Sequence, residues 1–314
     1  MNLSMHLLEL EITTRCNLNC LHCYNRGEEN VDFPFEQILK YIHFANDNNV
    51  STLIFSGGEA CLHKDFGKIC EYLKENRKSL TGIKKITLQT NGLIKNMNLE
   101  NLHGFDYIHL SFDIDENGLR EISLSQTVEL ANNIKSVGIK PYFFTTVHKK
   151  NLEHIDDIVN IAFNFCIDTG RDKEFLLSSD EKREAISKLL EYENSGKINK
   201  LRNPYVNSFK KMTLNEGEKF KIKGGCTAGI ASCDILANGD VLPCPFLRKK
   251  AGNIYKENLE DIWLNSELFS ILRNRKAYKK CGECKYLAYC GGCRESALTT
   301  SKEINGYDGN CIIS

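Results

Sequence analysis

Three cysteines stand close together near the start of the chain, in "TTRCNLNCLHCYN". Cys16, Cys20 and Cys23 follow a C-x3-C-x2-C spacing. A structural zinc site takes four protein ligands and a disulfide takes two cysteines, so three thiolates complete neither. The spacing also differs from the four-cysteine run of ordinary ferredoxins. Three thiolates therefore indicate a metal centre with one coordination position left for another ligand.

The last third of the chain is also rich in cysteine. Eight more occur there: Cys226, Cys233, Cys244, Cys281, Cys284, Cys290, Cys293 and Cys311. Taken alone, "CGECKYLAYCGGC" is compatible with a zinc ribbon. The whole chain has 14 cysteines. In a reducing compartment such a number points to metal binding rather than to disulfides.

Composition excludes several classes of partner. Lys plus Arg equals Asp plus Glu at 41 each, so no net field draws the chain to nucleic acid or to anionic lipid. No apolar run is as long as a membrane span requires. The N-terminus has neither the basic region nor the cleavage site of a signal peptide. We therefore expect a cytoplasmic protein without nucleic-acid or membrane partners.

The elements that must position these cysteines alternate between strand and helix. Runs rich in β-formers predict strands at 7–13, 51–56, 84–90, 107–113, 139–147 and 159–168. Helical patterns lie between or after them, at 35–48, 65–78, 123–137, 152–158 and 180–194. This order predicts an α/β fold, in which a parallel sheet with right-handed crossovers curls into a partial (β/α)6 barrel. The 314 residues suffice for this barrel and a smaller domain.

Polar residues follow several of the predicted strands. Gly57, Gly58 and Glu59 come after the second strand. The third strand ends in Thr90 and Asn91, and the fourth carries Ser111 and Asp113. In such folds the chemistry collects at the carboxyl ends of the strands, where the three-cysteine loop also lies. Paired glycines let a backbone approach a ligand closely. Each signal alone indicates a turn, whereas together they predict one site.

These motifs resemble the radical S-adenosylmethionine (SAM) superfamily, because C-x3-C-x-aromatic-C follows the first strand and GGE follows the second. In that family the three thiolates hold three irons of a [4Fe-4S] cluster, and the fourth iron takes the amino and carboxylate groups of SAM. An electron from the cluster cleaves SAM to a 5′-deoxyadenosyl radical, which abstracts a hydrogen atom from the substrate. The resemblance implies SAM contacts from His22, Gly57, Gly58, Glu59, Asn91, Ser111 and Asp113.

The C-terminal cysteines resemble the SPASM extension found on many radical SAM enzymes. The resemblance rests on their order, with "LANGDVLPC" before and "GNIYKENLEDIW" between. That extension holds two auxiliary [4Fe-4S] clusters, which makes three clusters in all. It implies one set of Cys226, Cys233, Cys244 and Cys293, and another of Cys281, Cys284, Cys290 and Cys311. Cys233 enters because two closed clusters need eight thiolates and the motif supplies seven. The alternative for Cys233 is a buried free thiol.

The chain then divides into a barrel at 1–195, a basic bridge at 196–225 and a SPASM domain at 226–314. The bridge holds eight Lys or Arg against two Glu. Such a bridge is most often a solvated connector. The alternative is a docking segment for an acidic electron donor such as flavodoxin or ferredoxin, or for an acidic peptide.

Three further cysteines lie in the barrel. Cys70 falls on an apolar helix stripe and is expected in the core. Cys61 follows the GGE segment, and Cys166 lies near the end of the sixth strand. Both are candidates for donating or accepting a hydrogen atom, with an inert buried thiol as the alternative.

SPASM proteins most often modify ribosomally made peptides or proteins by crosslinking, epimerisation or side-chain oxidation. Our first hypothesis is accordingly an oxygen-sensitive radical SAM oxidoreductase that acts as a peptide-modifying maturase. Sulfatase-maturating enzymes carry an Asp that acts as a base directly after the cysteine corresponding to Cys244. This chain has Pro245 there, which argues against that branch. The first strand begins at residue 7, so we expect no fused leader-binding domain, and a peptide substrate would need a separate leader-binding protein or direct docking on the barrel mouth.

Two alternatives remain open at this point. "YCGGCR", with two residues between its cysteines, resembles members of the haem pathway, which favours tetrapyrrole or other small-molecule biosynthesis. A non-catalytic zinc or iron–sulfur scaffold is the other alternative, and the open three-cysteine site argues against it.

Overall fold

The computed structural model describes residues 3–20, 23–24, 29–93, 98–112, 124–149, 151–157, 161–165, 175–196, 204–213 and 224–313. These residues form two compact units. The first lies within Met1–Phe112, Gly118–Phe144 and Gly229–Phe269, and the second within Asp113–Asn117, Thr145–Ala228 and Ser270–Ser314.

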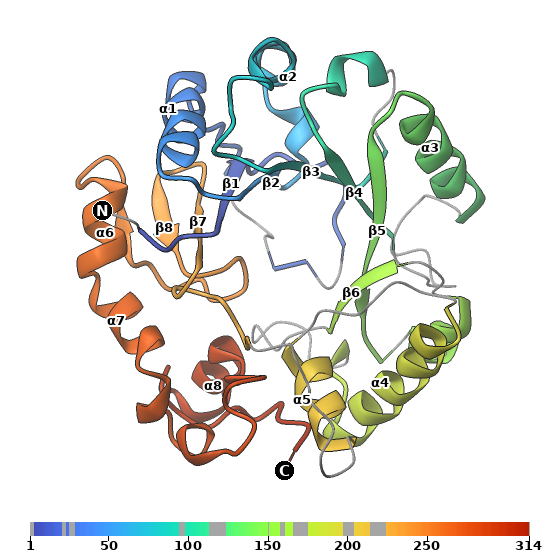
Figure 1. The fold of residues 1–314 in the computed structure, drawn as a ribbon, viewed down its shortest axis with the longest axis vertical. Coiled ribbons are helices and arrows are strands. Elements are labelled where there is room, and N and C mark those ends of the chain that lie inside the picture. Colours follow the sequence, from blue (N-terminus) through green and yellow to red (C-terminus); the bar gives the residue numbers. More distant parts are fainter. Residues whose placement is uncertain are drawn as a thin grey trace. The chain divides into compact units, whose positions relative to one another are not determined.

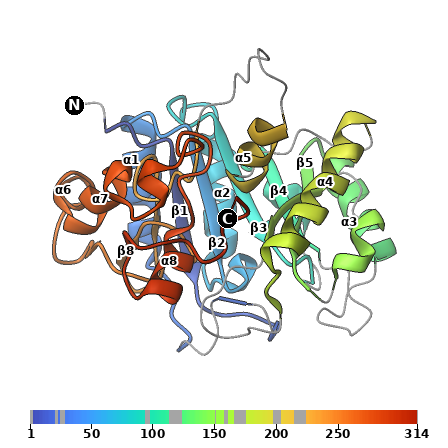
Figure 2. The same ribbon diagram turned by 90° about the horizontal axis from the view of Figure 1, so that it is seen from below.

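The first part of the chain alternates strand and helix as the sequence predicts (Figure 1). The strands are β1 (Leu7–Thr13), β2 (Thr52–Gly57), β3 (Lys85–Thr90), β4 (Tyr107–Ser111), β5 (Lys140–Val147) and β6 (Ile161–Phe165). The helices between the first five are α1 (Phe35–Asp47), α2 (Phe66–Asn76) and α3 (Leu124–Ser136). Short 3-10 helices lie at Ala60–Leu62, Leu99–Leu102 and Leu152–Asp157. Strands β1 to β5 pair in parallel, and Figure 2 shows β1 to β4 side by side. This sheet confirms the predicted α/β fold with an open barrel.

The chain later returns to the same sheet. Strand β7 (Ser232–Ile235) pairs in parallel with β1, and β8 (Asp240–Leu242) and β9 (Gly252–Asn253) extend the edge in antiparallel fashion. The strand order is β6-β5-β4-β3-β2-β1-β7-β8-β9. Helices α6 (Leu259–Asn265) and α7 (Glu267–Arg273) follow. The compact units therefore cut across the predicted boundary at 226, because β7 completes its hydrogen bonds on β1 rather than within a separate domain.

The two faces of the sheet differ in chemistry. One face is apolar: Leu8, Leu53 and Ile86 are register partners there, Leu88 pairs with Ile108, and all five are fully buried. Helices α1, α2 and α3 cover this outer side of β1 to β5 (Figure 1). Because side chains alternate along a strand, the opposite face carries the other residues. On that inner face Glu11 pairs in register with Ser56, and Gln89, His109 and Tyr142 are register partners on β3 to β5. Buried polar groups are costly in a sheet of this kind, so the inner face is the place to look for function.

The second unit is built mainly from short helices. Helix α4 (Ser179–Asn194) begins at Ser178, which forms a capping box with Glu181. The hydroxyl of Ser179 donates to the Cys311 carbonyl at 2.6 Å, so the end of the chain is fastened to α4. Helix α5 (Pro204–Thr213) lies inside the predicted bridge, and α8 (Arg294–Ser301) follows the last cysteine pair. Lys210 of α5 contacts both oxygens of Glu193 at 2.7 Å, which joins α5 to α4.

Candidate active site

The three-cysteine loop leaves the carboxyl end of β1 in a fixed direction. Thr13 forms an isolated antiparallel bridge with Asp32 and donates its hydroxyl to that carboxylate at 2.7 Å. The Arg15 guanidinium also contacts Asp32, at 3.2 Å. The start of the loop is thereby held between β1 and the segment that leads into α1.

The paired glycines after β2 hold the other side of this loop. The Gly58 amide donates to the Thr13 carbonyl at 2.8 Å, and the Glu59 amide donates to the Arg15 carbonyl at 2.6 Å. A Cβ atom on Gly57 would lie 2.2 Å from the Thr13 carbonyl oxygen, and one on Gly58 would lie 2.4 Å from that of Arg15. The sequence predicted a close approach to a ligand at these glycines. The close approach in the structure is to the cysteine loop's own backbone.

Glu59 and Asn91 join the ends of β2 and β3 beneath the loop. The Glu59 carboxylate accepts from the Asn91 amide at 2.7 Å and from the Cys61 amide at 3.2 Å. Burial raises the pKa of Glu59. The side-chain amide of Asn91 donates to Asn17 of the loop at 2.8 Å, and Asn17 in turn donates to the Leu93 carbonyl at 2.9 Å. Both side chains, predicted as SAM contacts, are thus engaged in positioning the loop.

Ser111 stands on the inner face at the carboxyl end of β4, opposite Phe144 of β5. This position keeps it available for the ribose contact that the sequence predicted. Three other predicted residues, His22, Asp113 and Cys166, lie outside the described residues.

Five of the predicted cluster cysteines have sulfur atoms that accept hydrogen bonds from backbone amides. In the first unit the Cys16 sulfur accepts from Leu18 and the Cys244 sulfur accepts from Leu247. In the second unit Cys284, Cys290 and Cys311 each accept from the amide two residues later, all at 3.4 Å. Cys293 is the N-cap residue of α8 and makes no side-chain capping hydrogen bond. Amide donors to sulfur stabilise thiolate ligands and tune iron–sulfur centres, so this donor set fits clusters.

Arg294 supplies a charged donor to one further cysteine. Its Nη2 lies 3.6 Å from the Cys281 sulfur, and its Nη1 donates to the carbonyls of Ile304 and Gly306 at 3.1 and 3.0 Å. The guanidinium also stacks over the Tyr278 ring at 4.1 Å. Arg294 is only 4% exposed, so a fixed positive charge is held beside the Cys281 sulfur.

Charge interactions within the second unit group its cysteines. Burial raises the pKa of Cys290 to about 12, with smaller contributions from neighbours that include Cys311 and Cys281. Burial also raises the pKa of Cys293, with Cys226 among its neighbours. Cys290, Cys281 and Cys311 thus lie near one another, and Cys293 lies near Cys226. The two ligand sets that the resemblance implies stay a prediction. Cys244 and Cys233 belong to the first unit.

Cys233 differs from the other predicted ligands. It pairs in register with Leu8, which places it on the apolar outer face of the sheet. Its side chain is fully buried, and its sulfur lies 4.0 Å from the Met5 sulfur and near Tyr41 of α1. A ligand must reach the metal from a polar or solvent-accessible pocket, whereas this thiol is packed among core side chains. The placement argues against the predicted ligand role and favours the alternative of a buried thiol.

Cys61 and Cys70 also lie on the helix side of the sheet. The Cys61 sulfur is 4.0 Å from the Thr90 hydroxyl, and Thr90 belongs to the outer face. Burial raises the pKa of Cys61 well above its usual range, with Glu59 as the next cause. Cys70 is buried in α2, as predicted. Because Cys61 lies against the helix layer, its position does not support the predicted role in hydrogen-atom transfer.

Sequence reasoning missed a cluster of charged side chains on the inner face. Glu9 and Glu11 of β1 and Asp234 of β7 are 5%, 1% and 1% exposed. Arg248 contacts both oxygens of Glu11, at 3.0 and 3.3 Å, and its guanidinium lies 5.8 Å from the centre of the Tyr24 ring. The signal in the sequence was the alternation "LELEIT", in which glutamate recurs every second residue of a strand buried on both faces.

Burial dominates the electrostatics of this cluster. It raises the pKa of Glu9 to about 6, although the nearby Ser56 hydroxyl opposes the shift. It raises the pKa of Asp234 well above its usual range, and Glu9 and Glu11 add to the effect. Tyr24, which follows Cys23, also has its pKa raised, by burial first and then by Glu11 and Glu9. The charged cluster therefore lies against the cysteine loop.

The opposite part of the inner face is aromatic. His109 of β4 stacks nearly parallel to Phe144 of β5, with ring centroids 6.5 Å apart. Tyr142 meets both His109 and Tyr107 at 6.0 and 5.5 Å. Burial lowers the pKa of His109 to about 4, so its imidazole is neutral near pH 7. The inner face thus offers acidic groups at β1 and β7, and aromatic groups at β4 and β5.

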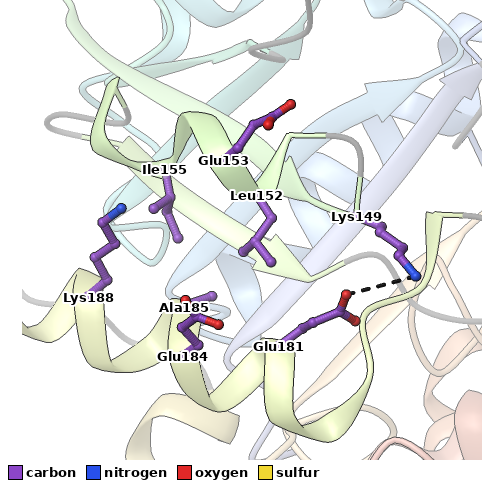
Figure 3. A pocket seen from close by; sticks show the side chains of 8 residues that line it. All are labelled: Lys149, Leu152, Glu153, Ile155, Glu181, Glu184, Ala185 and Lys188. Atoms are coloured by element: carbon purple, nitrogen blue, oxygen red, sulfur yellow. Dashed lines mark ion pairs between the residues drawn. The ribbon is translucent and has the colours of Figure 1, made fainter.

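A surface groove of about 390 Å³ lies elsewhere, in the second unit (Figure 3). It runs between the Leu152–Asp157 turn and α4, and Lys149 pairs with Glu181 across it at 3.9 Å. Its lining holds none of the residues that the sequence singled out. We therefore do not assign the chemistry to this groove.

The described residues form neither a site for a single metal ion nor a helix that could span a membrane. No three His, Cys, Asp or Glu side chains converge closely enough to hold a single metal ion. Thiolates around a four-iron cluster bind different irons, so they need not converge on a single point as the ligands of one metal ion do. No helix in the described ranges has the length and apolar character to cross a membrane.

Comparison with known proteins adds family relationships to this geometry. Residues 10–162 match the Radical SAM superfamily, and residues 226–285 match SPASM, an iron-sulfur cluster-binding domain. The chain is 26% identical to AdoMet-dependent heme synthase of Methanosarcina barkeri, over 98% of this chain and 96% of that protein. It is 27% identical to the antilisterial bacteriocin subtilosin biosynthesis protein AlbA of Bacillus subtilis, over 93% of this chain and 68% of that protein.

Solved structures show the same fold. Streptococcus suis SuiB bound to the precursor peptide SuiA aligns with a TM-score of 0.77 and 20% identity. The alignment covers 97% of this chain and 75% of SuiB.

Proposed function

The chain belongs to the radical SAM superfamily and carries a SPASM domain, and from this premise we propose that it modifies a peptide or protein substrate. The chain is an enzyme, and its radical SAM domain implies SAM and a [4Fe-4S] cluster. Its SPASM domain indicates auxiliary iron–sulfur clusters. We further propose three four-iron clusters in all, with an electron donor of the flavodoxin or ferredoxin type.

The residues of this chain have distinct parts in that chemistry. Cys16, Cys20 and Cys23 would hold three irons of the cluster at the carboxyl end of β1. When bound, cluster and SAM supply a 5′-deoxyadenosyl radical that removes a hydrogen atom from the substrate. The backbone of residues 57–59 would receive the SAM amino group, while Glu59 keeps the loop in place through its bonds to two amides. Ser111 would contact the ribose from the inner face.

The charge of the inner face supports a peptide rather than a haem precursor. A haem precursor carries propionate carboxylates, which need arginine or lysine partners. At β1 and β7 the described residues instead present Glu9, Glu11 and Asp234, and Arg248 is paired with Glu11. Such a surface would repel a carboxylate-rich substrate. This excess of buried acid is the observation that carries the proposal.

Tetrapyrrole chemistry is the second candidate. It is favoured by the match to a heme synthase along 96% of that relative's length. Lys85 and Lys140 begin β3 and β5, where their ammonium groups lie over the Tyr107 ring at 5.5 and 5.6 Å. These cations stand at the amino ends of the strands, away from the cysteine loop at the carboxyl ends. If a propionate bound to these lysines, the rest of the tetrapyrrole ring would have to extend over the acidic part of the inner face.

The test begins with the holoprotein purified without oxygen. We expect about twelve irons per chain, as three four-iron clusters require. Replacing Cys16, Cys20 and Cys23 together by Ala should leave about eight irons and abolish formation of 5′-deoxyadenosine under dithionite. Zinc in place of iron, or 5′-deoxyadenosine from the triple variant, would contradict the assignment.

Substrate class is tested separately by binding. Wild-type holoprotein is titrated with a pool of short capped peptides and with iron coproporphyrin. Binding of peptides alone supports the proposal. Tight binding of the porphyrin alone would favour tetrapyrrole chemistry over peptide modification.

A further inference from the structure

Two buried carboxylates stand side by side on the inner face. Glu9 of β1 and Asp234 of β7 are register partners on neighbouring parallel strands. Strands in a sheet lie about 4.8 Å apart, so the two side chains are close neighbours. Oε1 of Glu9 and Oδ2 of Asp234 are buried and have no hydrogen-bond partner in the described part of the chain. A buried carboxylate oxygen without a donor is costly, so each of these atoms calls for one.

The neighbouring cation does not meet this need. Arg248 directs its Nη1 to both oxygens of Glu11, and its guanidinium lies near the Tyr24 ring. Glu11 is 1% exposed and requires that pairing itself. At this end of β1 and β7 the described residues therefore present three carboxylates to one guanidinium. The cluster is short of positive charge and of hydrogen-bond donors.

The location of the pair connects it with the reaction. Tyr24 directly follows Cys23, and its ring lies 5.8 Å from the guanidinium of Arg248, which binds Glu11 two residues along β1 from Glu9. The pair is therefore near the cysteine loop and on the inner face. An occupant of this position would be held on the same face of the sheet as the cysteine loop, where hydrogen abstraction starts.

We propose that Glu9 and Asp234 form a subsite for a cationic group of the substrate, a protonated amine or guanidinium such as a lysine or arginine side chain of a peptide. The inference rests on the proposed function, because it names the part of a peptide substrate that the inner face receives. An ammonium or guanidinium supplies both the charge and the donors that the two free oxygens lack. Nothing covalent happens at this subsite: it holds the substrate in place.

A carboxylate pair kept for substrate binding is expected to destabilise the folded protein while no substrate is bound. Burial raises the pKa of Glu9 to about 6, so its ionised form costs more free energy in the folded protein than in the unfolded chain. A carboxylate kept only for structure would instead be stabilised by its contacts. Replacing Glu9 by the neutral isostere should therefore stabilise the holoprotein while weakening its hold on a basic substrate.

The experiment measures both effects on anaerobically purified holoprotein with SAM. The probes are three short capped peptides that differ at one position, Lys, Arg or norleucine. We expect the Lys and Arg peptides to bind wild type at least tenfold more tightly than the norleucine peptide, a difference of about 1.4 kcal/mol. Glu9→Gln and Asp234→Asn should each remove most of that preference without weakening the norleucine peptide. Glu9→Gln should also raise the Tm by about 2–4 °C.

Glu71→Gln is the matched control, because Glu71 is an exposed carboxylate on α2. It should leave both the peptide preference and the Tm unchanged. The subsite would be overturned if wild type bound the Lys and Arg peptides no better than the norleucine peptide. It would also be overturned if Glu9→Gln lowered the Tm and left the preference for basic peptides unchanged. If peptides bind regardless of charge, only the subsite fails. If iron coproporphyrin binds and no peptide does, the proposed function fails with it.

Discussion

Gly58 sets the position of the three-cysteine loop, and a single methyl group tests this. A Cβ atom on Gly58 would lie 2.4 Å from the Arg15 carbonyl oxygen and 2.7 Å from that of Thr14. Both neighbours are backbone atoms of the loop, so they cannot rotate away as a side chain would. Ordinary contact begins near 3.4 Å, which means that Gly58→Ala must displace the loop by about 1 Å.

The energetic cost follows from the same contacts. Overpacking against a fixed group typically costs about 1–3 kcal/mol. The shift also weakens the bonds from the Gly58 and Glu59 amides to the loop, which lie at 2.8 and 2.6 Å and contribute about 1 kcal/mol each. A cost of about 2–4 kcal/mol disfavours the native loop geometry by roughly 30-fold or more. The strain is local, so the cluster at the loop should suffer before the fold does.

Iron content and SAM cleavage are the measurements. We expect Gly58→Ala to fall from about twelve to about eight irons per chain and to lose most of its 5′-deoxyadenosine formation. The control is Gly67→Ala in α2, where an added Cβ meets nothing within 4 Å. Alanine should stabilise that helix by up to about 1 kcal/mol and leave the iron unchanged. A Gly58→Ala protein with full iron and normal SAM cleavage would refute this account of the loop.

Two further predictions concern the cysteine environments. Cys233→Ala should keep its iron and give unchanged electron paramagnetic resonance spectra with and without added cyanide. It should lose about 1–2 kcal/mol of stability, because it truncates a core side chain. Binding of cyanide to a cluster in this variant would show that Cys233 is a ligand. Arg294→Met should lower the reduction potential of the cluster that includes Cys281 by about 30–60 mV, because a positive charge beside the sulfur favours the reduced state. An unchanged potential in a redox titration of the intact protein would show that Arg294 serves only the carbonyls that it contacts.

The barrel strands could be predicted closely because their signals are local. "LLELEIT" gave β1 with the bounds that the structure has, Leu7–Thr13. The alternation of glutamate in that strand also marked the inner face, yet a strand pattern does not say which face meets helices. Only the register with β2 and β7 shows that Glu9 and Glu11 point away from the helix layer.

Cys233 shows where sequence reasoning reached its limit. Counting thiolates required an eighth ligand, and Cys233 was near the motif in the sequence. Its side chain is placed by β7, which pairs with β1 across more than 200 residues, from Cys233 to Leu8. That pairing puts Cys233 in an apolar row and its neighbour Asp234 on the inner face. A pattern confined to the cysteine motif contains no information about this partner. Helix α5 was missed for a different reason, because the charged composition of the bridge masked its helical segment.

One strand carries both the cation subsite and the start of the cysteine loop, and this limits the substrate. Glu9 and Thr13 lie four residues apart in β1, which corresponds to about 13 Å along the strand. An extended peptide covers at most about 3.3–3.6 Å per residue. A peptide held by its basic side chain at Glu9 and Asp234 therefore needs at least about four residues to bring another of its atoms to the loop. The modified position in a peptide substrate is accordingly expected about four residues or more from a lysine or arginine.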